Sequence, residues 1–172
     1  HVTYTGGPGL GRGIGHARGA SLESLERSGN DALLGGTDGA ILLPDPGAFD
    51  SVSVGSPALV RRGDTGEFLL WYSGHADSAF DGSGDSVPTG LAIGLARSDD
   101  GVHYARTDRG VEGTARVLVP GAAGSWDSQA VTAASVYFDN GRFHLWYHGF
   151  DGTQWRTGRA TSIDGIQWSK DA

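Results

Sequence analysis

The sequence predicts an all-β fold made of repeated four-stranded antiparallel meanders, and three observations carry that prediction. Glycine supplies 30 of the 172 residues, more than twice the usual share of roughly 7%, while long apolar helical stripes are few. Runs rich in aromatic and β-branched residues recur in the same order along the chain, as expected of a structural repeat. Asp-Gly and Asn-Gly pairs separate these runs, as hairpin turns between short strands require.

The repeat is visible as two full copies and one clipped copy. The first full copy carries, in order, an aromatic-Asp-Ser triplet at 49–51, FLLWYSG at 68–74, IGLARS at 93–98 and Asp-Gly at 100–101. The second copy carries the matching features at 126–128, 143–149, 157–162 and 164–165. The clipped copy opens the chain with VTYTG at 2–6 and GIGHAR at 13–18. The chain therefore holds about two and a half units.

Each full copy predicts four strands. In the first copy they are 56–60, 68–72, 92–97 and 102–106, and in the second copy 134–138, 143–147, 158–161 and 166–169. The second strand of each copy is apolar on both alternating faces, which predicts a strand buried between two neighbouring sheets. Trp71 and Trp146 lie in these strands and are predicted to be core residues.

The segments between the strands predict tight turns. Asp100-Gly101 and Asp164-Gly165 predict type I′ hairpins between the third and fourth strands, because glycine tolerates a positive φ. The segments 63–66 and 139–141 serve the same purpose between the first and second strands. In the clipped copy, 21–27 fits either two helical turns or, in the register of the repeat, a turn followed by a fourth strand, and we favour the register.

Four-stranded units that repeat radially are the blades of a β-propeller. We assign residues 1–48 to the C-terminal part of a clipped blade plus a connection, 49–106 to a full blade, and 107–172 to a connection plus a second full blade. Propellers usually have four or more blades, so about two and a half blades would not close a ring. The chain also begins with His1 and has no Met, so we expect a partial or processed chain.

Composition narrows the classes of partner. The formal charge is −7, which argues against nucleic acid or an anionic membrane surface, because both call for clustered Lys and Arg. No run of 18 apolar residues is present, so no membrane-spanning helix is expected. The absence of Cys excludes disulfides and thiolate metal sites and leaves the localisation undetermined.

Meander geometry places the candidate site residues on one rim of the sheets. Asp50 and Asp127 come just before a first strand, whereas four polar residues come just after a second strand: His75, Asp77, His148 and Asp151. Trp155 lies in the loop that follows in the second full copy. Rims with long loops usually hold the binding sites of repeat proteins, so these residues are candidates for binding a substrate.

A structural alternative stays open for each candidate. The recurrence of Asp50 and Asp127 in equivalent positions fits a turn or capping role, and Trp155 fits a lid over the next blade. The aspartates at 77, 81 and 85 hint at structural calcium, but they lack the spacing and the closing Glu of a known calcium loop. We therefore expect no cofactor and no metal site. No G-x-S-x-G nucleophile elbow is present.

The segments at 49–57, 71–74 and 93–104, with their counterparts at 126–128, 146–149 and 162–168, resemble the arabinanase/levansucrase/invertase superfamily of five-bladed propellers. The resemblance covers nearly the whole chain. It implies glycoside hydrolysis or transfer, often on furanosides, by an Asp nucleophile or base, a second Asp and a Glu general acid. Asp50 and Asp127 match the two aspartates, but the acid is missing from the match. Of the four Glu residues, Glu23 and Glu26 fall near an outer strand and Glu67 lies on the other rim. Glu112 lies in a connection between blades but in no recognisable motif.

Two hypotheses follow. In the first, the chain is part of a glycoside hydrolase-like propeller that acts on or binds carbohydrate and is not catalytic without further blades. In the second, it is a non-catalytic propeller segment that serves as a scaffold or interaction subunit of a larger assembly. The expected partners are a carbohydrate, the missing blades or another protein subunit.

Overall fold

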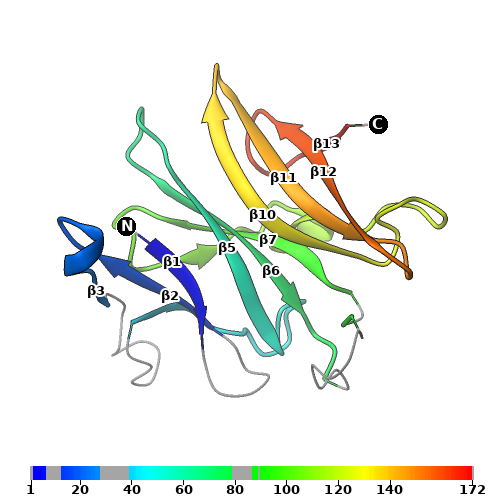
Figure 1. Ribbon diagram of the computed structural model, residues 1–172, viewed down its shortest axis with the longest axis horizontal. Helices are drawn as coiled ribbons and strands as arrows, with labels where there is room; N and C mark the ends of the chain where they lie inside the picture. The colour runs from blue at the N-terminus through cyan, green and yellow to red at the C-terminus, as the bar shows by residue number, and fades with distance from the viewer. Residues whose placement is uncertain (1, 7–12, 28–38, 79–86, 89, 172) are drawn as a thin grey trace.

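Three antiparallel sheets follow one another along the chain in the computed structural model, which describes residues 2–6, 13–27, 39–78, 87–88 and 90–171 (Figure 1). The first sheet holds β1 (Val2–Gly6), β2 (Gly13–Arg18), β3 (Glu26–Arg27) and β4 (Ala40–Leu42). The second holds β5 (Ser53–Arg61), β6 (Phe68–His75), β7 (Ala92–Ser98), β8 (Ala105–Arg106) and β9 (Arg116–Leu118). The third holds β10 (Ala130–Asp139), β11 (Arg142–Phe150), β12 (Trp155–Ser162) and β13 (Ser169–Lys170).

The predicted meander is confirmed in both full copies, where the strands pair in chain order from β5 to β8 and from β10 to β13. The fourth strand is shorter than predicted, because β8 and β13 have two residues each. In the clipped copy a 3-10 turn, η1 (Leu22–Ser24), leads into β3, so the register of the repeat gave the correct interpretation of 21–27.

The outer edge of the third strand is shared between two short segments. β8 pairs with β7 at Ala96 and Arg97, while β9 pairs with the same strand at Ile93 and Gly94. The first sheet has the same arrangement, because β3 and β4 both pair with β2. Each connection between units therefore adds a short strand to the sheet that it leaves.

The second sheet lies between the other two and is covered on both faces (Figure 1). All eight residues of β6 are buried, as the two apolar faces of this strand predicted. One face, with Leu69 and Trp71, shares a hydrophobic core with Phe143 and Leu145 of the third sheet. The other face, with Leu70, shares a smaller core with the first sheet.

The second strand of the third sheet, β11, is predicted to be buried on both faces, and this prediction is wrong for one of them. Residues of β11 alternate between buried and accessible, and Trp146 keeps 43% of its surface exposed. Phe143, Leu145 and Tyr147 are buried against the second sheet. Trp146 points to the opposite side, where no described sheet covers it. Trp71, in contrast, is fully buried as predicted.

The turns differ by position. Asn140 and Gly141 have φ values of 48° and 75°, as expected of a type I′ hairpin. The type I′ prediction is wrong between the third and fourth strands, where Gly101 and Gly165 have a positive φ but the preceding Asp does not. There the side chain of Ser162 accepts hydrogen bonds from the backbone N–H groups of 164 and 165, and Ser98 does the same in the second sheet.

Candidate functional site

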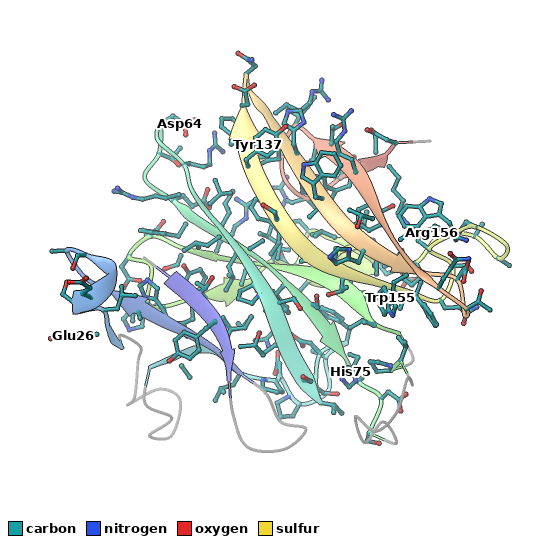
Figure 2. All side chains as sticks on the ribbon, viewed as in Figure 1. Glu26, Asp64, His75, Tyr137, Trp155 and Arg156 are labelled. Atoms are coloured by element: carbon teal, nitrogen blue, oxygen red, sulfur yellow. The ribbon has the colours of Figure 1, made fainter. Side chains whose placement is uncertain are left out.

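The candidate residues lie at one end of the sheets. Figure 2 shows Asp64 and Tyr137 at the end that carries the hairpins between the first and second strands, and His75 and Trp155 at the other end. Asp50 joins the latter end, because its backbone neighbour Val52 donates to the His75 carbonyl. The rim that meander geometry predicts is therefore present, and we call it the loop rim.

Asp50 lies in the turn before β5, with its side chain against Gly74 of the second sheet. Its side chain has no exposed surface, and Arg106 from β8 donates to its Oδ2 from Nε at 2.9 Å. Nη2 of the same guanidinium donates to the backbone carbonyl of Leu43, just after β4, at 2.5 Å. Tyr72 lies beside the carboxylate, where burial and the charge of Asp50 both raise the pKa of this phenol above its ordinary value.

Asp127 also lies beside a base and a tyrosine in the third sheet, where, unlike Tyr72, the tyrosine donates to the carboxylate. Lys170 from β13 donates from Nζ to its Oδ2 at 2.5 Å and to the carbonyl of Val119 at 2.8 Å. The Tyr147 hydroxyl and the Ser125 hydroxyl complete the shell at 3.1 and 2.9 Å. Burial acts to raise the pKa of Asp127, but the hydrogen bonds from Lys170 and Ser125 outweigh it and hold this pKa below its ordinary value.

Each of these clusters joins four parts of a blade: the outermost strand, the second strand that carries the tyrosine, the start of the innermost strand and the connection before it. We call them Asp–Tyr–base locks, made of Asp50, Tyr72 and Arg106 in one sheet and of Asp127, Tyr147 and Lys170 in the next. The base reaches from the outermost strand to the start of the innermost strand and to the connection that precedes it. Both carboxylates are buried and neutralised, so the geometry favours the structural alternative for the two aspartates.

Glycines on the second strand make room for these locks. A side chain at Gly74 would collide with Asp50, and one at Gly149 would collide with Asp127. These glycines belong to the repeated Trp-Tyr-x-Gly motif. The sequence shows the motif, but only the structure shows that glycine is needed there because the aspartate side chain lies against it. The sequence analysis did not identify the two bases as lock residues. The sequence feature that could have identified Arg106 and Lys170 is a basic residue at the equivalent position of the fourth strand in both full copies.

The remaining candidates differ in their access to solvent. His75 is buried, and this burial lowers its pKa while the nearby Asp77 acts to raise it. His148 is exposed, and its Nδ1 lies 2.9 Å from the Thr157 hydroxyl. Trp155 keeps 44% of its surface exposed and stacks on Phe150 with 5.0 Å between ring centroids.

Asp151 organises the hairpin between β11 and β12. Its Oδ1 accepts hydrogen bonds from the backbone N–H groups of Thr153 and Gln154 and from the Thr153 hydroxyl. Its Oδ2 pairs with Arg156 at 2.6 Å. These hydrogen bonds, led by that from the Thr153 side chain, hold the pKa of Asp151 well below its ordinary value. Sequence analysis did not single out Arg156, which follows Trp155 directly.

A hydrogen bond between side chains joins the second and third sheets near their loop rims. Ser73 of β6 and Thr132 of β10 share a hydrogen bond of 2.5 Å between their hydroxyls. His75 and Asp77 follow Ser73, and His148 is the strand partner of Thr132. The structure thus brings the candidates from both sheets to one edge, with Trp155 and Arg156 as its exposed aromatic and cationic groups.

Within the described ranges, no group of three or more His, Asp or Glu side chains could hold a metal ion. Asp81 and Asp85 of the calcium hypothesis lie outside the described residues, so that hypothesis stays a prediction. The described part of the chain also contains no helix with the length and hydropathy that crossing a membrane requires.

The sequence matches no protein-family model and no curated protein. Solved structures, however, share its fold. A sucrose-6-phosphate hydrolase from Lactobacillus gasseri aligns with 98% of the chain at 15% identity and a TM-score of 0.66. A protein from Bacteroides thetaiotaomicron, provisionally assigned as a glycosidase, aligns with 76% of it at 23% identity and a TM-score of 0.58.

A third structure comes from the GH130 family of mannoside phosphorylases, described as containing glycoside hydrolases that target β-1,2 mannosidic linkages in Candida mannan. It aligns with 68% of the chain at 21% identity and a TM-score of 0.52. The chain spans only 30% to 38% of the length of these three structures. The likeness confirms the predicted fold of propeller blades, which these glycosidase structures share. At the level of the fold it also confirms the resemblance to the five-bladed propeller superfamily.

Proposed function

We propose that this chain is part of a glycoside hydrolase-like propeller and presents a carbohydrate-binding surface on the loop rim of its third sheet. The observation that carries the proposal is Trp155, a 44% exposed indole held in place by Phe150. An apolar ring face beside fixed polar groups suits a sugar, which presents both C–H faces and hydroxyls. Arg156 and Asp151 supply those polar groups. The fold shared with glycosidases adds an analogy, at the level of the fold alone, in favour of a carbohydrate ligand.

We further propose that Asp50 and Asp127 serve the blade locks and that the chain does not hydrolyse glycosides by itself. Hydrolysis requires two carboxyl groups that flank the glycosidic bond, about 5–9.5 Å apart. Both aspartates are instead buried and bonded to a base. Among the Glu residues whose ion pairs are described, Glu67 pairs with Arg97 and Glu112 with Arg116, so both of these carboxylates are bonded to a guanidinium.

The test is binding of a defined set of sugars to the chain and to Trp155→Ala, measured by isothermal titration calorimetry. The set contains β-1,2-mannobiose, sucrose 6-phosphate and an arabinofuranose oligosaccharide. We expect one of these classes to bind and Trp155→Ala to weaken it about tenfold or more, about 1.4 kcal/mol. Tyr137→Ala is the matched control, since Tyr137 is a 45% exposed aromatic residue at the opposite end of the sheet. No binding, or equal loss in both variants, would overturn the proposal.

A further inference from the structure

The third sheet presents an aromatic face that no described residue covers. This outer aromatic face consists of Tyr137, His144, Trp146 and His148, which lie on the same side of β10 and β11. The Tyr137 and His144 rings stack with 4.7 Å between centroids, and Tyr137 and Trp146 keep 45% and 43% of their surfaces exposed. Large aromatic surfaces gathered on one face of a sheet usually mark an interface.

The same face of the second sheet shows what such a surface does. Its equivalent residues are Leu69, Trp71 and Ser73, and all three are buried. The third sheet covers them, and Trp71 donates from Nε1 to the carbonyl of Gly165 in the turn before β13 at 3.0 Å. Ser73 accepts a hydrogen bond from the backbone N–H of Ala133 at 3.0 Å. This face is therefore a docking surface for the sheet that follows.

The docking contact occurs twice in the chain. Thr5 of the first sheet, at the place of Ser73, accepts a hydrogen bond from the backbone N–H of Ser56 at 3.0 Å. Ser56 and Ala133 lie at the equivalent bulge in β5 and β10, where the strand register shifts. Each sheet thus receives the innermost strand of its successor through one side chain at a fixed position. In the third sheet that position is His148.

We propose that the outer aromatic face docks a further four-stranded sheet of the same repeat, which lies outside residues 1–172. In this interface Trp146 takes the place of Trp71 and donates to the glycine carbonyl of a Ser-x-Asp-Gly turn. His148, whose Nδ1 lies against Thr157, offers its other ring nitrogen to the N–H at the bulge. Trp155 stays at the rim of this interface, as its equivalent Leu91 does with partial exposure.

A second copy of this chain does not suit the face. The innermost strands of its second and third sheets are already docked on the preceding sheets, through the contacts of Ser56 and of Ala133. Its first sheet has the sequence GASLESL at 19–25 in place of the Ser-x-Asp-Gly turn. Within the described residues, no sheet therefore has both the turn and an innermost strand that is not already docked. The partner is a sheet from elsewhere, defined by its turn and by an apolar innermost strand.

Hydroxyl-radical footprinting tests the proposal on the protein isolated from its natural source and on the recombinant chain of residues 1–172. We expect oxidation of Trp146 to be slower in the natural protein by about fivefold or more, since burial removes an indole from solvent. Exposed Ile163, 72% accessible, serves as the control that should react equally. Cross-linking from Arg159→Lys, whose residue pairs with Trp146 across the strands, identifies the covering peptide.

The outcomes separate clearly. Protection of Trp146, together with a cross-link to a peptide that belongs to a sheet with a Ser-x-Asp-Gly turn, supports the proposal. Equal oxidation in both samples overturns it, and so does a cross-link to a peptide of any other kind. Trp146→Ala adds a second measurement: it should lower the melting temperature of the natural protein by about 4 °C or more and leave that of residues 1–172 nearly unchanged. An equal loss in both would indicate a role within the chain and contradict the docking.

Discussion

At the scale of single residues, the structural role that we propose for the Asp–Tyr–base locks would account for the acidic residue before the first strand of each full copy. The sequence showed the aspartates and their repetition, and it offered two roles for them. The choice between these roles depends on Arg106 and Lys170, which lie far along the chain and meet the aspartates only after the sheet has formed. Pattern alone could therefore identify the positions but not their chemistry.

Removing the carboxylate of a lock should destabilise the chain strongly. Asp127→Ala removes the carboxylate to which the Lys170 ammonium and the Tyr147 hydroxyl donate, and breaking a buried ion pair costs about 3 kcal/mol or more. Urea unfolding followed by tryptophan fluorescence measures the loss. The double variant Asp127→Ala/Lys170→Met is the control and should recover part of the stability. A loss below about 0.5 kcal/mol, typical of surface substitutions, would contradict the lock.

The lock also predicts a dependence of stability on pH. The pKa of Asp127 is lower in the folded chain than the ordinary value, which is about 3.9 in an unfolded chain. Such a group adds stability that is fully present above that value and is lost as the pH falls through the folded value. Asp127→Asn should therefore lose less stability than the unaltered chain between about pH 4 and pH 2. Identical slopes of unfolding free energy against pH would exclude this contribution.

At the scale of elements, the turns before β8 and β13 show where the pattern was insufficient. An Asp-Gly pair predicted a two-residue hairpin, but Asp164 instead accepts hydrogen bonds from the N–H groups of 166 and 167, and Ser162 accepts from 164 and 165. This side-chain network lengthens the turn and shortens the strand after it. The repeated Ser-x-Asp-Gly motif carried the information, although its geometry follows only from the competition between side-chain and ladder hydrogen bonds.

Gly165 offers a test of that turn and of the contact between sheets. Its φ is 75°, and an added Cβ would lie 2.8 Å from the Trp71 ring. Gly165→Ala should therefore cost about 2 kcal/mol or more in unfolding free energy, from strain and displaced packing together. Gly141→Ala is the matched control, because Gly141 has the same φ and open space around it. Equal losses in the two variants would show that Trp71 does not depend on this turn.

At the scale of the whole molecule, the sequence predicted the number, order and pairing of the sheets because the repeat fixes all three. It could not predict the exposure of Trp146, since the apolar pattern of a strand is set by what covers it and not by its own sheet. The same argument applies to Trp155, for which sequence allowed either a sugar platform or a lid. The structure describes an exposed ring at the rim, and the choice between partners then belongs to the experiments above.

The two hydrophobic cores predict that the sheets differ in local stability. The second and third sheets share the larger core, around Trp71, Phe143 and Leu145, whereas the first sheet joins the second through the smaller core around Ile14 and Leu70. Native-state hydrogen exchange should therefore show the amides of β2 opening at a lower free energy than those of β6 and β11, because local opening follows buried apolar contact.

Leu145→Ala, which costs about 2–5 kcal/mol, should lower the protection of β6 and β11 together. Leu70→Ala should lower the protection of the β2 amides by a larger fraction than it lowers that of the β11 amides, because Leu70 belongs to the smaller core. Equal protection in all three strands, with the same response to both substitutions, would mean that the three sheets unfold as one unit and that the smaller core couples them as strongly as the larger one.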